Sequence, residues 1–363
     1  MRRALMLFLG TALAAAPLAA LAADAPAAAK AAAPAAFKAP KNAFGQPDLS
    51  GFWTNATLTP MTRSPAVGGR PAYTADEVKK MEAAVVKEVE EGNAPTDPNA
   101  PAEAKRREDV NIRPEFAAAG GDVGGYNRGW LDPGSTVMRV HGEPRTSLIM
   151  TPNGLPPARK AGAAAAGGFR GGLGSFDNPE QRSLGERCIL SFGRNAGPPM
   201  FPNGFYNNNY QLLQTPDAVF IEVEMVHDYR VVRLNSKHRT DGVRPYMGDS
   251  IGWWDGDTLV VETTNIPQAQ NFMGSWKDLK VTERFQRVGK NRLYYGFQVE
   301  DASTWDKPWG GEYEFSPMQN GVIYEYACHE GNYALPGMLA GARQQEAAAA
   351  DAAKTGAKPG GAN

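Results

Sequence analysis

The stretch that decides the fold is residues 207–234, which reads NNNYQLLQTPDAVFIEVEMVHDYRVVRL. It predicts two strands, residues 210–214 and 218–226, separated by a turn at residues 215–217. The turn contains Pro216, and proline fixes its own φ at a value that a turn needs. The stretch is therefore expected to fold as an antiparallel hairpin.

The second predicted strand alternates apolar and charged side chains. Glu222 and Glu224 fall on one face, and valine, isoleucine and methionine side chains fall on the other. This period of two is typical of a strand that is buried on one face only. Continued further, the alternation places His227 on the apolar side, and Arg230 follows close behind. The sequence therefore predicts that this strand packs in the core and that the residues directly after it belong to a functional site.

After residue 250 the chain repeats pairs of strands. An Asp-Gly pair at residues 255–256 lies between two strand-like runs and is typical of a two-residue hairpin turn. The predicted strands are 250–254 with 257–265, 279–288 with 292–301, and 311–315 with 322–328, preceded by 135–140 and 147–150. A total of about eight to ten strands predicts an all-β, mainly antiparallel fold. We expect a lipocalin-like β-barrel, with a two-sheet sandwich as the alternative.

Composition divides the chain into four parts. Residues 1–22 carry two arginines, an apolar run and a small-residue cleavage site, which predicts a signal peptide and a periplasmic or secreted protein. Residues 23–46 form an Ala/Pro-rich linker. Residues 47–343 form a single β-rich domain with irregular segments and one helix over 74–91, which begins with a capping box. Residues 344–363 are expected to form a disordered tail.

Charge and hydropathy exclude two classes of partner. The chain has 38 basic and 39 acidic residues and a net charge of -1, so no nucleic-acid partner is expected. After residue 22 no segment is long and apolar enough to predict stable membrane insertion. A phosphate-loop motif is also missing, and no cofactor is predicted. The expected partner is a small-molecule ligand or substrate, and the sequence gives no indication of oligomeric state.

The chain contains two cysteines, Cys188 and Cys328. In an exported protein an isolated pair of cysteines is most often a disulfide, and we predict one here. The alternative is a pair of reduced, buried thiols.

Four ionisable residues fall in line with apolar positions of the predicted strands: His227, Glu283, Asp301 and Glu330. Burying a charge without a partner is costly, so such groups usually pair or line a wet cavity. Each residue alone has a structural interpretation, as a core histidine, an ion pair or a turn cap. Together they favour a polar pocket in the barrel. His227, His329 and a carboxylate could ligate zinc, but no metal-binding spacing supports this and no metal is predicted.

Seven segments stand out as motifs: PDLSGFW at 47–53, RC at 187–188, NNYQLLQTPDAVFIEVEMVHDYRVV at 208–232, GDSIGWWDGDTLVVETTN at 248–265, VTERF at 281–285, VEDASTWDKPW at 299–309 and YEYACHEGNY at 324–333. In combination they resemble a family of uncharacterised secreted bacterial proteins. The resemblance implies an exported, mostly β protein, and it carries no established activity over to this chain. Its motifs include most of the ionisable residues named above.

The leading hypothesis is a periplasmic small-molecule enzyme that uses acid–base catalysis in a polar, aromatic-lined barrel pocket. A lyase, hydratase, isomerase or hydrolase without an organic cofactor fits this description. His227 is the predicted base, and Glu283 or Asp301 would orient it or act as the acid. The residues predicted to bind substrate are Asn208, Tyr210, Arg230, Tyr326, His329, Glu330 and Asn332. The competing hypothesis is a non-catalytic, lipocalin-like ligand-binding protein with the same pocket.

Overall fold

The computed structural model describes residues 37–93, 132–163, 176–191, 197–204, 206–319 and 321–355. The predicted signal peptide, residues 1–22, and residues 23–36 of the predicted linker lie outside the described residues. The remainder of that linker is folded, because Ala39 is buried and Lys41 forms a β-bridge with Pro47. The folded domain therefore begins before residue 47, where composition places its start.

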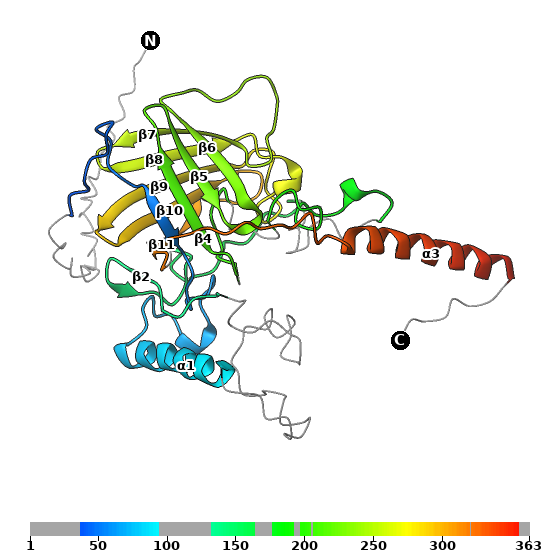
Figure 1. Cartoon of the computed structure of the whole chain (residues 1–363), viewed down its shortest axis with the longest axis horizontal. Coiled ribbons are helices and arrows are strands. Elements are labelled where there is room, and N and C mark those ends of the chain that lie inside the picture. The colour runs from blue at the N-terminus through cyan, green and yellow to red at the C-terminus, as the bar shows by residue number, and fades with distance from the viewer. Residues whose placement is uncertain are drawn as a thin grey trace, which may run out of the picture. The chain divides into compact units, whose positions relative to one another are not determined.

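Nine strands form a closed barrel (Figure 1). Their order is β1-β11-β10-β9-β8-β7-β6-β5-β4, so the first strand of the chain lies between β4 and β11. Neighbouring strands are antiparallel except β6 and β7, which are parallel. The bounds are β1 (Gly51–Thr54), β4 (Asn209–Gln214), β5 (Ala218–Val223), β6 (Asp228–Leu234), β7 (Asp249–Asp255), β8 (Thr258–Thr264), β9 (Lys280–Gly289), β10 (Arg292–Glu300) and β11 (Trp309–Pro317). The predicted all-β barrel is confirmed, and the sandwich alternative is not formed.

The turn between β5 and β6 begins earlier than the sequence predicts, so the alternation of apolar and charged side chains along β5 is shorter. A short 3-10 helix, η4 (Met225–His227), follows β5, and both Val226 (φ 60°) and His227 (φ 44°) have left-handed backbone conformations. A β-branched residue in this region is a genuine outlier. Because the extended chain stops at Val223, the period-2 pattern does not reach His227. The prediction that its imidazole lies on the apolar face is wrong.

Three predicted strands near the barrel are shortened or missing. Residues 135–140 contribute the two-residue strand β2 (Arg139–Val140), which pairs with β3 (Glu143–Pro144). Residues 147–150 contribute a β-bridge from Ile149 to Gly311. Residues 322–328 form no strand. The reason is that β11 already pairs with β10 on one side and β1 on the other, which leaves it no free edge.

Two α-helices are described outside the barrel. The capping box predicts α1 (Ala75–Asn93) correctly, since Thr74 N–H donates to the Glu77 carboxylate at 2.7 Å. The second, α3 (Ala334–Thr355), occupies part of the tail expected to be disordered, and its alanine content favours a helix. Three short 3-10 helices are η1 (Pro65–Val67), η3 (Pro179–Gln181) and η5 (Gln268–Gln270). No helix in the described part of the chain is both long and apolar enough to cross a membrane.

The barrel interior is filled by aromatic side chains and by side chains of a segment that precedes β4. Residues 197–204 place Met200 and Phe201, both fully buried, among the strands. The Met200 N–H donates to Tyr295 Oη at 2.8 Å, and the Phe201 ring lies 4.8 Å from that of Phe297. Asn203 N–H donates to Tyr313 Oη at 3.0 Å. These contacts make the segment part of the core.

A buried ion pair crosses this interior. Arg230 of β6 makes two hydrogen bonds to Glu283 of β9, one of them from Nη2 to Oε1 at 2.9 Å. Tyr295 Oη of β10 donates to the same Oε1 at 2.9 Å. Arg230 and Glu283 are 2% and 0% exposed, so both charges depend on each other for compensation.

Replacing Glu283 by Gln should therefore destabilise the protein strongly. The substitution leaves the Arg230 guanidinium buried without a counter-charge, which typically costs about 3–5 kcal/mol. The double variant Arg230→Met/Glu283→Leu removes both charges and should recover part of this loss. Urea unfolding at neutral pH measures the free energy of unfolding, and Glu300→Gln, at the end of β10, serves as the control. A Glu283→Gln protein as stable as that control would contradict the assignment.

Candidate functional site

The structure does not gather the predicted catalytic residues at one place. His227 is exposed in the turn after β5. Glu283 is buried in the barrel, and its described hydrogen bonds go to Arg230 and Tyr295 rather than to this imidazole. Glu283 therefore does not orient His227. Arg230, predicted to bind substrate, is occupied by the same ion pair.

Asp301, the other predicted acid, stabilises the loop after β10. Its carboxylate accepts hydrogen bonds from the hydroxyls of Ser275, Ser303 (2.6 Å) and Thr304 (2.8 Å), and from the Ser303 N–H at 2.8 Å. Burial acts to raise the pKa of Asp301, but these donors outweigh it and hold the pKa below its ordinary value. A carboxylate with this many donors is a loop cap and a poor proton donor.

Two predicted substrate-binding residues at the start of β4 are structural. Asn208 is fully buried, and its amide donates to the carbonyls of Asp132 and Gly204, both at 2.8 Å. Tyr210 is fully buried and accepts from Asn55 Nδ2 at 3.1 Å. Burial raises the pKa of the Tyr210 phenol, so it stays neutral.

The remaining predicted residues lie on the segment before α3. Tyr326 Oη is 3.0 Å from Tyr206 Oη, and the two rings stack. Asn332 Nδ2 donates to the Glu186 carbonyl at 2.8 Å. His329 and Glu330 are exposed. The structure thus leaves His329 and Glu330 exposed, while Tyr326 and Asn332 are half-buried and engaged in structural contacts.

The predicted disulfide is present and joins this segment to the chain before β4. Cys188 and Cys328 are bonded, with Cα atoms 5.6 Å apart. Close behind Cys188, the Ser191 N–H donates to Asp228 Oδ2 at 3.3 Å. Asp228 is buried at the start of β6, and burial raises the pKa of its carboxyl to about 7, although the Ser191 N–H acts to lower it.

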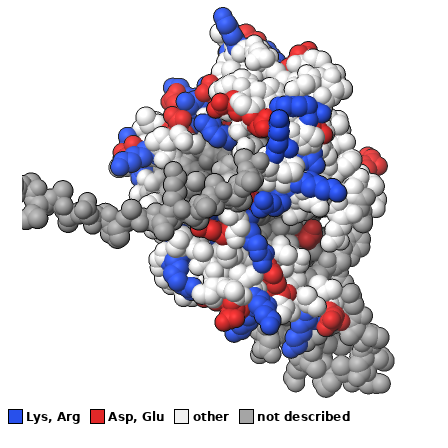
Figure 2. All heavy atoms as spheres, turned by 90° about the vertical axis from the view of Figure 1, so that its left-hand side faces the viewer, with Lys and Arg blue, Asp and Glu red and all other residues white. Residues whose placement is uncertain are grey.

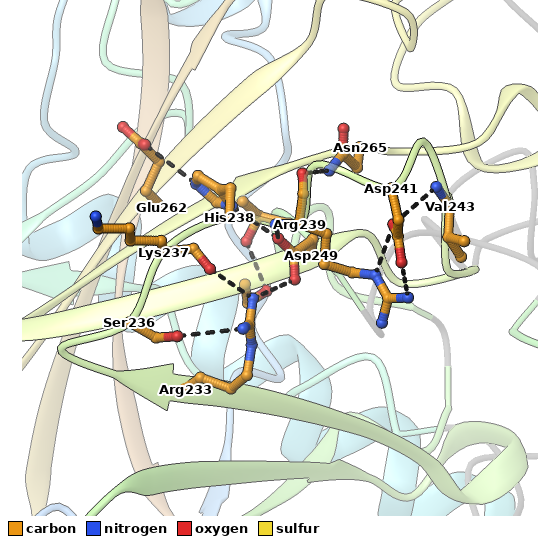
Figure 3. Close-up of polar contacts among 12 residues, drawn as sticks. Arg233, Ser236, Lys237, His238, Arg239, Asp241, Val243, Asp249, Glu262 and Asn265 are labelled. Carbon is orange, nitrogen blue, oxygen red and sulfur yellow. Dashed lines mark hydrogen bonds and ion pairs between the residues drawn. The ribbon is translucent and has the colours of Figure 1, made fainter.

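A different histidine has the geometry expected of an acid–base residue. His238 lies in the connection, residues 235–248, between the parallel strands β6 and β7. Its Nδ1 is 3.0 Å from Asp249 Oδ2 and its Nε2 is 3.2 Å from Glu262 Oε1 (Figure 3). Ionised carboxylates only accept hydrogen bonds, so both contacts form together when both ring nitrogens carry hydrogen. The side chain is 23% exposed and is therefore open to solvent.

The residues around His238 hold this arrangement in place. Asp249 also accepts from Arg233 Nη2 at 2.7 Å and from the Arg239 N–H at 2.8 Å. Burial acts to raise the pKa of Asp249, but the Arg239 N–H, His238 and Arg233 together lower it. Glu262 lies on β8, where Lys280 Nζ is 3.8 Å from its second oxygen. A carboxylate whose pKa is lowered in this way lies against Nδ1 and fixes the orientation of the imidazole ring.

The connection that carries His238 is attached to the barrel on both sides of it. Arg239 forms an ion pair with Asp241, which also accepts the Val243 N–H at 3.1 Å (Figure 3). Arg244 Nη1 donates to the Ile266 carbonyl at 2.9 Å. These contacts fix the connection and therefore the position of His238.

Sequence reasoning missed His238 because its partners are distant in sequence. The connection reads NSKHRTDGVRPYMG, without a strand or helix period that would assign a face to the histidine. The signal that existed was the length of this segment, since parallel neighbours need a crossover connection and hairpin neighbours do not. Only the parallel pairing of β6 with β7 brings residue 238 to Asp249 and Glu262.

The distribution of surface charge and a search for metal-binding groups give two further observations about the molecule. On the face shown in Figure 2, Lys and Arg side chains are interspersed with Asp and Glu. In the part of the chain that the structure describes, no group of three or more His, Cys, Asp or Glu side chains has an arrangement that could hold a metal ion. The described contacts of His238 with its two carboxylates are hydrogen bonds.

The carboxyl of Asp228 should make stability depend on pH. Its pKa of about 7 in the folded state lies above the ordinary value of 3.8, so between these values the folded protein holds a proton that the unfolded chain releases. The resulting contribution to the free energy of unfolding is fully present below pH 3.8 and is lost as the pH rises through 7.

At pH 8, Asp228→Asn should therefore have a free energy of unfolding about 1–4 kcal/mol higher than that of the parent protein, and it should unfold at a higher urea concentration. Near pH 4 the two proteins should be equally stable. The control is Asp306→Asn, whose side chain is 84% exposed. An equal difference at both pH values would show that Asp228 is not the group responsible.

Comparisons with known proteins give no further guide to the activity. Neither protein-family models nor curated proteins nor solved structures match this chain. The function has to be argued from the site itself.

Proposed function

We propose that the chain is an exported small-molecule enzyme that uses acid–base catalysis, with His238 as the residue that transfers the proton. The observation that carries this proposal is the imidazole of His238 held between Asp249 and Glu262 at 3.0 and 3.2 Å. A proton-transferring residue must lie within hydrogen-bond reach of a group that orients it and be reachable by substrate. His238 meets both conditions, and exposed His227 has no described carboxylate partner.

The three side chains have distinct roles in this proposal. Asp249 orients the ring through its contact with Nδ1. Glu262, whose side chain is 27% exposed, occupies Nε2 until a substrate atom replaces it. Lys280, 3.8 Å away, then offers the displaced carboxylate a partner. With substrate at Nε2, the imidazole can donate or accept one proton, which suits a lyase, hydratase, isomerase or hydrolase and needs no organic cofactor.

The surroundings favour an anionic substrate in the periplasm or outside the cell. Lys237, next to His238, is exposed, whereas Arg239 on the other side is already paired with Asp241. The predicted signal peptide and the disulfide support export, since disulfides persist in oxidising compartments. The competing proposal, a lipocalin-like carrier, needs room inside the barrel, and Met200 and Phe201 fill that interior. The enzyme is therefore the better supported of the two.

The test starts from small molecules that co-purify with the exported protein, identified by mass spectrometry. Incubation with the protein should convert at least one of them. His238→Gln should lower the turnover by at least about a hundredfold, as expected for loss of a general acid–base residue. Asp249→Asn should lower it by a smaller factor, and His227→Gln is the matched control that should leave it unchanged.

Stability of each variant is measured separately by urea unfolding, so that lost activity is not confused with lost structure. Conversion that survives His238→Gln would remove the assignment. Ligands that bind tightly and are returned unchanged would favour the carrier.

A further inference from the structure

A second site lies outside the barrel, away from His238. A pocket of about 160 Å³ opens between the chain after β1 and the strand β11. Its lining includes Arg63, Arg145, Ser147, Met150, Thr151 and Glu312. The lining thus combines charged groups with apolar side chains, which include Ile149. A cavity of about 150 Å³ is large enough for one benzene ring, so this pocket suits a small organic molecule.

Arg63 has an unusual position in this pocket. The residue is only 8% exposed, yet it forms no ion pair with any carboxylate in the described chain. Its Nε donates to Thr146 Oγ1 at 3.0 Å, and its Nη1 donates to the Pro152 carbonyl at 2.7 Å. These neutral acceptors leave Nη2 free of any described partner. A buried guanidinium without a counter-charge is costly, and an anion bound in the pocket would remove that cost.

The surrounding backbone fixes the guanidinium in place before any ligand arrives. The Arg63 N–H donates to the Gly154 carbonyl at 3.0 Å. A Cβ added at Gly154, whose φ is +66°, would lie 2.6 Å from Ser147 Oγ and 2.7 Å from Arg63 Cβ. Thr146 Oγ1, which accepts from Arg63, itself donates to the Arg70 carbonyl at 2.6 Å. The cation is therefore held rigidly at the pocket wall, as a preorganised binding site requires.

The second arginine and the glutamate limit the charge of the ligand. Arg145 is already paired with Glu143 at 2.9 Å and with Glu312 at 2.5 Å. The other Glu312 oxygen accepts from Tyr294 Oη at 3.3 Å, so both oxygens of this carboxylate already have partners at the pocket. One unpaired cation beside one carboxylate suits a single negative charge and disfavours a dianion such as phosphate. We propose that this pocket binds a small organic monocarboxylate, with its carboxylate on Arg63 and its apolar part against Ile149 and Met150.

Isothermal titration of the full-length protein with benzoate and butyrate tests this proposal, with inorganic phosphate as the comparison anion. Saturable binding of at least one carboxylate is expected, tighter than that of phosphate. Arg63→Met should weaken it by at least about tenfold, because a charge-assisted hydrogen bond is lost. Arg159→Met, at an exposed arginine outside the pocket lining, is the matched control and should bind like the parent protein.

A second variant keeps the test independent of how well Arg63→Met folds. Met150 is 57% exposed at the pocket rim, and Met150→Trp should fill the pocket and abolish binding while Arg63 stays in place. The proposal is overturned if neither carboxylate binds, if phosphate binds more tightly than both, or if binding survives Met150→Trp.

Discussion

The structure depends on one ion pair inside the barrel, in which Glu283 compensates the charge of Arg230. Arg230 lies among aromatic side chains at 2% exposure, where a lone guanidinium could not be tolerated. Glu283 supplies the counter-charge and Tyr295 completes its hydrogen bonding. Since Tyr295 Oη also accepts the Met200 N–H, the same network holds the segment that fills the barrel. One ion pair thus links β6, β9, β10 and residues 197–204.

This packing determines where chemistry can occur. In a lipocalin-like barrel the interior is the natural place for a ligand, but here buried side chains, including those of Met200 and Phe201, fill it. The groups that remain accessible lie outside the barrel wall. His238 is placed there by the crossover between β6 and β7, and Arg63 by the chain that follows β1. The barrel therefore offers a rigid support for the two proposed sites, both of which are built by its connections.

Much of the barrel could be predicted from the sequence, because strand alternation and hairpin turns are local signals. The pattern correctly placed Glu283 in line with buried Val281 and Phe285. It could not predict that Val226 adopts a left-handed conformation, which moves His227 out of the strand. Nor could it predict that β1 occupies the edge of β11 and excludes residues 322–328. The candidate site was missed for the same reason: it depends on strand pairings between residues far apart in the sequence.

The position of β1 also has a consequence for the folding kinetics. Trp53 pairs with Pro317, so the barrel cannot close until nearly the whole chain is available. Pairings of such long sequence separation have a high loop-closure entropy and form slowly. Until then both barrel edges stay unpaired and prone to aggregation.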